Sequence, residues 1–263
     1  MLPSKLLNYQ FQPCPHPNLQ PTLVFIHGLF GDMNNLGIIA RAFSENYNIL
    51  WVDLRNHGQS FHSDEMNYDL MAQDLAHLLD YLSLKHVILI GHSMGGKTAM
   101  KLTALSPRLV TKLIVIDIAP VSYNHNWHAE VFAGLFAVRQ SKAQTRQQAK
   151  PILENHITDP SIVQFMLKSF NPHCDQYFRF NVSALFNNYA NLMDWKSIES
   201  NNTPTLFIKG GLSSYIDPND TANILAQFPN ATSFTINACG HWAHAEKPEF
   251  VIRAIERFLN KNL

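Results

Sequence analysis

The stretch Gly91-His92-Ser93-Met94-Gly95 joins two segments of different character, and it decides how the chain around it folds. Residues 86–90 before it are mostly β-branched or aliphatic, which is typical of a buried strand. Residues 97–105 after it carry apolar side chains at helical spacing. A strand that passes through Gly-x-Ser-x-Gly into a helix is typical of a nucleophile elbow, where small glycines permit a strained turn that exposes the serine. We therefore predict Ser93 as a nucleophile, with an idle serine in a glycine-rich turn as the alternative.

Around this stretch, apolar runs typical of strands alternate with helical patterns. Such alternation predicts an α/β fold with a mostly parallel sheet that helices cover on both faces. The predicted strands are residues 22–26, 48–53, 86–90, 112–116, 205–209 and 232–237. The predicted helices are residues 34–45, 68–82, 97–105, 218–228 and 248–259.

The alternation stops between residues 120 and 200, where helical stretches are punctuated by prolines. We predict a core formed by residues 1–119 and 201–263, interrupted by a helical cap or lid over residues 120–200. Active sites of open parallel sheets lie at the carboxyl ends of the strands. A lid inserted between two core strands is therefore expected to wall the substrate pocket.

A serine nucleophile needs a base and donors for the oxyanion of the attacked carbonyl. His241 follows the last predicted strand and is the candidate base. The backbone N–H of Met94, directly after the serine, is one candidate oxyanion donor. The second is the N–H of Leu29, because His-Gly at residues 27–28 follows an apolar strand as in known oxyanion loops. An ordinary strand–helix turn at this point is the alternative.

These segments together resemble the α/β-hydrolase family over nearly the whole chain, and among its branches the YbfF-type bacterial esterases. The resemblance rests on His-Gly at 27–28, Asp-Leu-Arg-Asn-His-Gly-Gln-Ser at 53–60, the elbow at 91–96, Asp-Ile-Ala-Pro at 117–120, and His-Trp-Ala-His-Ala-Glu-Lys-Pro at 241–248. It implies an α/β-hydrolase fold with a helical lid insertion. It also implies esterase activity.

The acid that orients the histidine departs from the usual pattern. Most α/β-hydrolases carry it as Gly-x-x-Asp after the penultimate strand, but here Ser213 occupies that position. Asp217 is the nearest downstream carboxylate, whereas Asp117 ends the strand that follows the elbow helix. We favour Asp117, and the resemblance implies the same residue. It further implies that Ser213 hydrogen-bonds within the site, although a loop hydroxyl that serves the local backbone is the alternative.

Three other polar residues lie close to these segments. His92 precedes the nucleophile, and we expect it to pack or hydrogen-bond rather than to catalyse. Arg55 and His57 are expected to organise a turn near the active face. Aromatic residues of the insertion, such as Trp127, are expected to form mostly lid core, with a few lining an acyl pocket.

Composition narrows the classes of function. The chain has 263 residues, of which 46% are hydrophobic, and its 20 basic and 20 acidic residues give a formal net charge of zero. Balanced charge argues against a nucleic-acid partner. The 13 histidines and three cysteines form no metal-binding or disulfide pattern, so we expect no metal. No window of 18 apolar residues and no leader pattern over residues 1–5 is present, so we expect a soluble, cytoplasmic protein without a membrane partner.

The sequence thus predicts a serine hydrolase that cleaves small-molecule carboxylic esters or acyl-CoA thioesters through an acyl-enzyme, without a cofactor. Perhydrolysis and carbon–carbon bond hydrolysis use the same three residue types and stay open. A small-molecule binding protein on the same scaffold is the alternative from another class. The physiological substrate, the acyl chain length and the oligomeric state are not encoded in these patterns.

Overall fold

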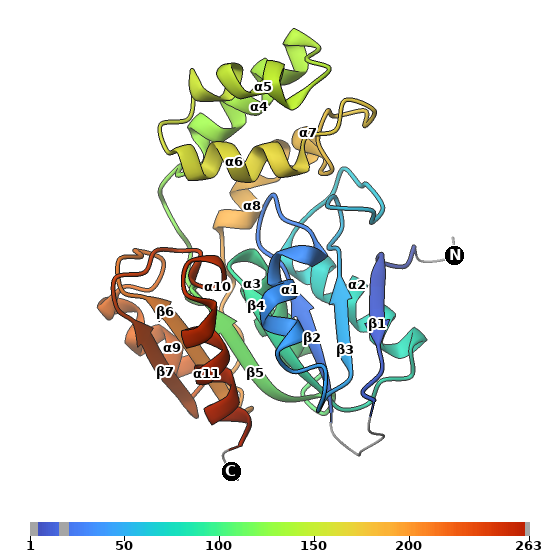
Figure 1. The fold of residues 1–263 in the computed structure, drawn as a ribbon. Coiled ribbons are helices and arrows are strands. Elements are labelled where there is room, and N and C mark those ends of the chain that lie inside the picture. Colours follow the sequence, from blue (N-terminus) through green and yellow to red (C-terminus); the bar gives the residue numbers. More distant parts are fainter. Residues whose placement is uncertain (1–4, 16–20, 261–263) are drawn as a thin grey trace.

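The computed structural model describes residues 5–15 and 21–260, and over these ranges it forms a seven-stranded sheet in the order β1-β3-β2-β4-β5-β6-β7 (Figure 1). Strand β1 pairs with β3 in the antiparallel sense, and all other neighbouring strands are parallel. The strands are β1 Tyr9–Gln12, β2 Thr22–Ile26, β3 Ile49–Val52, β4 Val87–His92, β5 Val110–Ile116, β6 Thr205–Gly210 and β7 Ala231–Ile236. The predicted α/β-hydrolase fold is confirmed.

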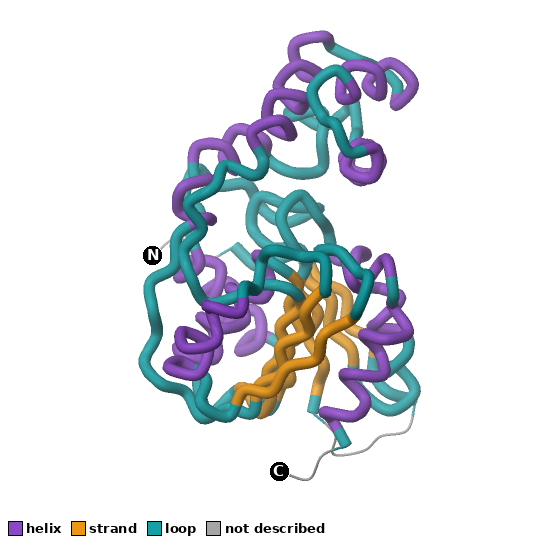
Figure 2. Tube along the Cα trace, turned by 90° about the vertical axis from the view of Figure 1, so that its left-hand side faces the viewer, coloured by secondary structure: helices purple, strands orange, loops and turns teal. Residues whose placement is uncertain are grey.

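Helices cover both faces of this sheet, as the tube view shows (Figure 2). The core helices are α1 Gly37–Arg41, α2 Tyr68–Tyr81, α3 Met94–Leu105, α9 Thr221–Gln227, α10 Ala243–Glu246 and α11 Pro248–Leu259. Leu75 of α2 and Met100 of α3 belong to the hydrophobic cluster on one face. Ile39 of α1 and Ile255 of α11 belong to the cluster on the other. Within the described ranges, no helix has the length and apolar character needed to span a membrane.

Two predicted helices differ from the observed ones, and strand β1 was missed. The helix expected over 34–45 is a 3-10 turn, Met33–Leu36, followed by the short helix α1. The helix expected over 218–228 begins with a second 3-10 turn, Pro218–Asp220, before α9. Strand β1 was not predicted, because this edge strand has four residues and none of them is fully buried, so no apolar run marks it. Residues 1–4, part of the stretch examined for a leader pattern, lie outside the described residues.

Between β5 and β6 the chain forms the predicted helical insertion, which lies beyond the carboxyl ends of the central strands (Figure 1). Its helices are α4 Ala129–Ser141, α5 Arg146–Glu154, α6 Pro160–Ser169, α7 Val182–Asn187 and α8 Tyr189–Met193. The core holds both ends of the insertion by hydrogen bonds. The buried Lys97 of α3 donates from Nζ to the backbone oxygens of Val121 (2.8 Å) and Asp194 (3.4 Å), and the Tyr68 hydroxyl of α2 donates to the Leu192 oxygen (2.6 Å).

Candidate active site

Ser93 lies at the sharp turn between β4 and α3. Its backbone has φ 52° and ψ −120°, a left-handed conformation that is costly for a residue with a side chain. The turn is crowded, because a Cβ at Gly95 would lie 2.3 Å from the Ile26 backbone oxygen, and a Cβ at Gly91 would lie 2.3 Å from the Gly95 oxygen. Both glycines are therefore required by backbone contacts. The geometry is that of the predicted elbow.

Asp117 follows β5 at the same edge of the sheet, and its side chain is completely buried. Its carboxylate accepts three hydrogen bonds. Oδ1 accepts from the Gly210 backbone N–H (2.9 Å), and Oδ2 accepts from Nδ1 of His241 (2.7 Å) and from the Ser213 hydroxyl. The structure thus brings together an aspartate, a histidine and a serine from the ends of three different strands.

Asp217, the alternative acid, lies elsewhere. It is exposed, and its side chain accepts from the Asn219 backbone N–H (2.9 Å) as the cap of the 3-10 turn. Ser213 has two roles, since its oxygen also accepts from the Tyr215 backbone N–H (3.2 Å). The sequence offered two interpretations of Ser213, a hydroxyl of the site and a hydroxyl that serves the local loop. Ser213 makes both kinds of contact.

The imidazole of His241 is held on several sides. Nδ1 donates to Asp117, so the neutral ring carries its lone pair on Nε2. The ring of Tyr215 stacks on it with centroids 3.9 Å apart and planes 20° apart. His92 donates from Nε2 to the His241 backbone oxygen (2.9 Å), and the two rings lie 4.7 Å apart. The expected hydrogen-bonding role of His92 is confirmed, and its partner is the histidine loop.

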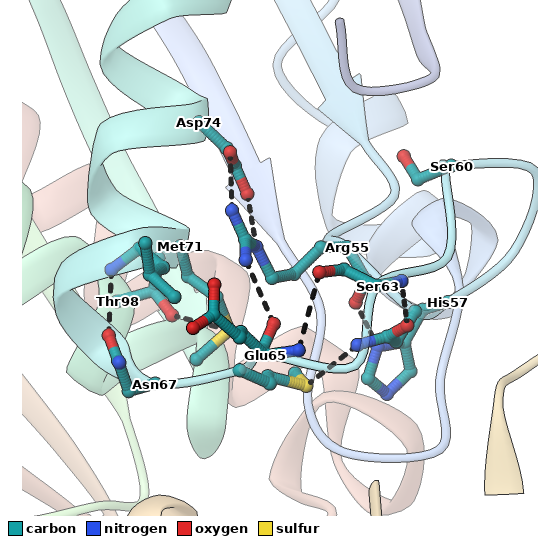
Figure 3. Close-up of polar contacts among 12 residues, drawn as sticks. Arg55, His57, Ser60, Ser63, Glu65, Asn67, Met71, Asp74 and Thr98 are labelled. Atoms are coloured by element: carbon teal, nitrogen blue, oxygen red, sulfur yellow. Dashed lines mark hydrogen bonds and ion pairs between the residues drawn. The ribbon is translucent and has the colours of Figure 1, made fainter. Parts of the chain in front are cut away.

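The loop after β2 is supported from the segment that follows β3. The Phe30 N–H donates to Nε2 of His57 (3.2 Å), whose Nδ1 in turn lies 3.0 Å from the Arg55 backbone oxygen. Arg55 forms a two-point ion pair with Asp74 of α2, with distances of 2.6 and 2.8 Å, and donates to the Glu65 oxygen (Figure 3). Arg55 and His57 thus organise a turn, as expected.

This support anchors the loop that carries one of the two candidate oxyanion donors. Leu29 lies between Gly28 and the anchored Phe30 and lines the cavity that also contains Ser93. Met94 is the first residue of α3, so its N–H has no acceptor within the helix, and the N-terminal end of a helix favours negative charge.

A cavity of about 370 Å³ lies between the sheet edge and the insertion. Ser93 and His241 line it from the core. Trp127, near the start of α4, and Phe165 of α6 line it from the insertion. Other insertion aromatics are fully buried, among them Phe178, which agrees with the expected lid core.

The comparisons with known proteins assign this architecture to a family. The family model described as the alpha/beta hydrolase fold matches residues 21–165. The chain is 46% identical to esterase YbfF of Escherichia coli over 254 residues, covering 97% of this chain and 99% of that protein.

The chain belongs to the α/β-hydrolase family.

Other similar proteins are also named as esterases. A Haemophilus influenzae protein named as a candidate esterase/lipase is 63% identical over 262 residues, covering all of this chain and 91% of that protein. The solved structure of an esterase from a marine microorganism superimposes with a TM-score of 0.90 at 34% identity, covering 97% of this chain and all of that one.

The hydrolase keeps several neutral histidines next to its site. Burial lowers the pKa of His92 well below its usual range, and the neighbouring His244 and His241 add to this effect. Burial also lowers the pKa of His244 to about 3, helped by His241 and Lys168. Nδ1 of His244 is buried without a hydrogen-bond partner among the described residues. A charge on either ring is therefore unfavourable in the folded protein.

We expect His244 to make the fold sensitive to acid. Its pKa falls from 6.5 when unfolded to about 3 when folded, so between these values the unfolded chain binds more protons and stability decreases as pH falls. One such proton changes the free energy of unfolding by about 2 kcal/mol between pH 7 and pH 5. In urea unfolding, His244→Phe should reduce the loss of stability between these pH values by about that amount. An unchanged difference between the two pH values would show that His244 is not responsible.

Proposed function

We propose that this α/β-hydrolase is a serine esterase that hydrolyses carboxylic esters through an acyl-enzyme, with Ser93, His241 and Asp117 as its catalytic triad. The observation that carries the proposal is the 2.7 Å contact between Nδ1 of His241 and the buried Asp117 carboxylate, at the strand edge where the strained turn presents Ser93. The relatives named as esterases support the choice of esters as substrates.

The chemistry follows from the tautomer of the neutral His241 ring. Because Nδ1 donates to Asp117, the Nε2 lone pair is available to take the proton of Ser93 as its oxygen attacks the ester carbonyl. The imidazolium that forms is stabilised by the Asp117 anion and returns the proton to the leaving alcohol. His241 then takes a proton from water as the water oxygen attacks the acyl-enzyme carbonyl. It returns this proton to the Ser93 oxygen as the bond between that oxygen and the acyl carbon breaks, and the acid is released.

The N–H groups of Leu29 and Met94 are the proposed donors to the oxyanion of the tetrahedral intermediate. No cofactor enters this scheme. Residues 120–200 are proposed to act as the lid that shapes the substrate pocket, since Trp127 and Phe165 line the cavity from that side. Acyl-CoA thioesters are a second substrate class for the same mechanism, because their carbonyl is attacked in the same way.

The function is tested by incubating the purified protein with p-nitrophenyl esters and with acyl-CoA thioesters of graded chain length. We expect turnover of the p-nitrophenyl esters, with a burst of nitrophenolate where breakdown of the acyl-enzyme is slower than its formation. Absence of turnover on every ester and thioester would contradict the proposal and favour the binding-protein alternative.

Ser213 is proposed to support Asp117 as a fourth member of the site. Ser213→Ala removes one neutral hydrogen-bond donor from the carboxylate, while His241 and the Gly210 N–H remain. A net hydrogen bond is worth about 0.5–1.5 kcal/mol, so kcat should fall about 2- to 13-fold. Steady-state kinetics on one p-nitrophenyl ester measure this, with the exposed Ser233→Ala on β7 as control. No change in kcat would limit Ser213 to its contact with the Tyr215 backbone.

A further inference from the structure

His128 is a polar residue in the cavity wall that the proposed triad does not use. It precedes α4 and lines the cavity together with Ser93 and His241. Its ring meets the edge of Phe30, with centroids 5.7 Å apart, next to the loop that carries Leu29. His128 therefore faces the proposed oxyanion loop from the insertion side.

The orientation of the His128 ring is fixed by Tyr189 of α8, whose hydroxyl oxygen lies 2.8 Å from Nδ1. Burial raises the pKa of Tyr189 to about 12, so the phenol keeps its proton. A phenol is a stronger hydrogen-bond donor than a neutral imidazole N–H, and an imidazole nitrogen is a stronger acceptor than a phenol oxygen. The Tyr189 hydroxyl therefore donates its proton to Nδ1 of His128.

With Nδ1 accepting, the neutral imidazole carries its own hydrogen on Nε2. Burial lowers the pKa of His128 to about 4, and the nearby His241 contributes to this, so the ring is neutral at neutral pH. Among the described residues Nε2 has no hydrogen-bond partner, and it is not one of the buried unpartnered polar atoms. It is therefore exposed to solvent, and His128 lines the cavity.

The surroundings of this N–H make it selective. Four apolar side chains of the insertion line the same cavity: Val131, Ile162, Phe165 and Met166. A purely aliphatic substrate would cover the N–H without offering an acceptor, and a buried donor left unpaired is costly.

The charge of the cavity defines the kind of acceptor. Asp159 and Glu246 line the cavity, and no lysine or arginine is among the described residues that line it. Hydrogen bonds from Ser161 hold the pKa of Asp159 below its usual range, so this carboxylate is charged at neutral pH. These protein carboxylates would repel a carboxylate group on the substrate, but they would not repel an uncharged acceptor oxygen.

We propose that His128 determines substrate specificity, donating from Nε2–H to a second, uncharged acceptor oxygen of the ester, such as an ether, keto or further ester oxygen. This inference rests on the proposed esterase function and names the class of ester within it. The acceptor belongs to either the acyl or the alcohol part of the substrate, and separate pairs of esters distinguish the two.

The test compares esters that differ by one oxygen in place of a methylene. The acyl pair is p-nitrophenyl methoxyacetate and p-nitrophenyl butyrate, and the alcohol pair is 2-methoxyethyl acetate and butyl acetate. His128→Asn keeps an acceptor for Tyr189 but has no donor at the Nε2 position, whereas His128→Gln places an N–H near that position. The two esters of a pair differ in intrinsic reactivity, but this difference is the same for every variant. Comparing the ratio of their kcat/KM values between wild type and variant therefore removes it.

We expect His128→Asn to lower this ratio about 2- to 13-fold in one of the pairs, and His128→Gln to restore most of it. The pair that responds identifies the part of the substrate that carries the acceptor. Ratios unchanged in both pairs, with wild-type hydrolysis intact, would overturn the role of His128 alone. Absence of hydrolysis of all four esters by the wild type would instead overturn the proposed function and this inference with it.

The tautomer gives a readout that is independent of turnover. The tautomer is measured by NMR spectroscopy of ¹⁵N-labelled protein at pH 7, with the His128 resonances assigned by comparison with His128→Asn. We expect Nε2 of His128 to be protonated and Nδ1 to be unprotonated. Tyr189→Phe should remove this preference. A proton on Nδ1 in the wild type would overturn the inference.

Discussion

Replacement of Ser93 by alanine should lower kcat for a p-nitrophenyl ester by several orders of magnitude and leave the fold intact. The hydroxyl is the atom that forms the covalent intermediate, and its loss in other serine hydrolases removes nearly all of the triad's contribution, on the order of 10⁶-fold. The substitution also leaves the backbone of the elbow unchanged, because alanine retains the Cβ that Ser93 already places at φ 52°. Single-turnover and steady-state kinetics measure the effect, and circular dichroism verifies the fold.

The matched control is Ser214→Ala, which removes an exposed serine from the rim of the same cavity. Its kcat should stay close to that of the wild type. If Ser93→Ala retained more than about a tenth of the wild-type kcat, a covalent serine mechanism would be excluded.

Asp117→Asn should be nearly as damaging, with a loss in kcat of up to about 10⁴-fold, the scale observed when a triad aspartate becomes asparagine. The amide has the size of the carboxylate, so Gly210 and His241 keep their positions. It removes the negative charge that stabilises the imidazolium, and its N–H₂ group favours the tautomer with the proton on Nε2 of His241, which is then no base. Thermal unfolding separates this effect from a loss of structure.

Asp217→Asn is the control that distinguishes the two candidate acids. Asp217 is exposed and caps a 3-10 turn, so its replacement should change kcat by less than about twofold. A crippled Asp217→Asn beside a nearly normal Asp117→Asn would reverse the assignment of the acid.

Much of the fold could be predicted because its central strands are buried on both faces. The residues of β2, β3 and β4 are all buried, so they read as continuous apolar runs, and the predicted bounds of β2 match the observed ones. Strand β1 was missed because half of its residues are exposed, so its sequence shows no apolar run. Only its hydrogen-bonded pairing with β3 identifies it as the edge strand. Side-chain hydrogen bonds from the capping residues Asp32 and Asp217 start 3-10 turns. The helix expected over 34–45 is therefore shorter, and the one expected over 218–228 is divided.

The site was predictable where local backbone chemistry marks a residue. Ser93 lies between glycines that backbone contacts require, and Asp117 and His241 follow strands that end at one edge. Tyr215 and His128 carry no such mark. Tyr215 matters because its ring stacks on His241, and His128 because Tyr189, 61 positions away, fixes its ring. These contacts depend on loop and cap packing, which one sequence does not encode in any local pattern.

The central claim, that Ser93 is a nucleophile activated by His241, is tested most directly by reaction with a fluorophosphonate followed by intact mass measurement and peptide mapping. We expect one adduct per chain, located on Ser93, formed by the wild type and not by Ser93→Ala, and strongly slowed in His241→Ala. An unmodified wild-type chain, or an adduct on a residue other than Ser93, would contradict this account.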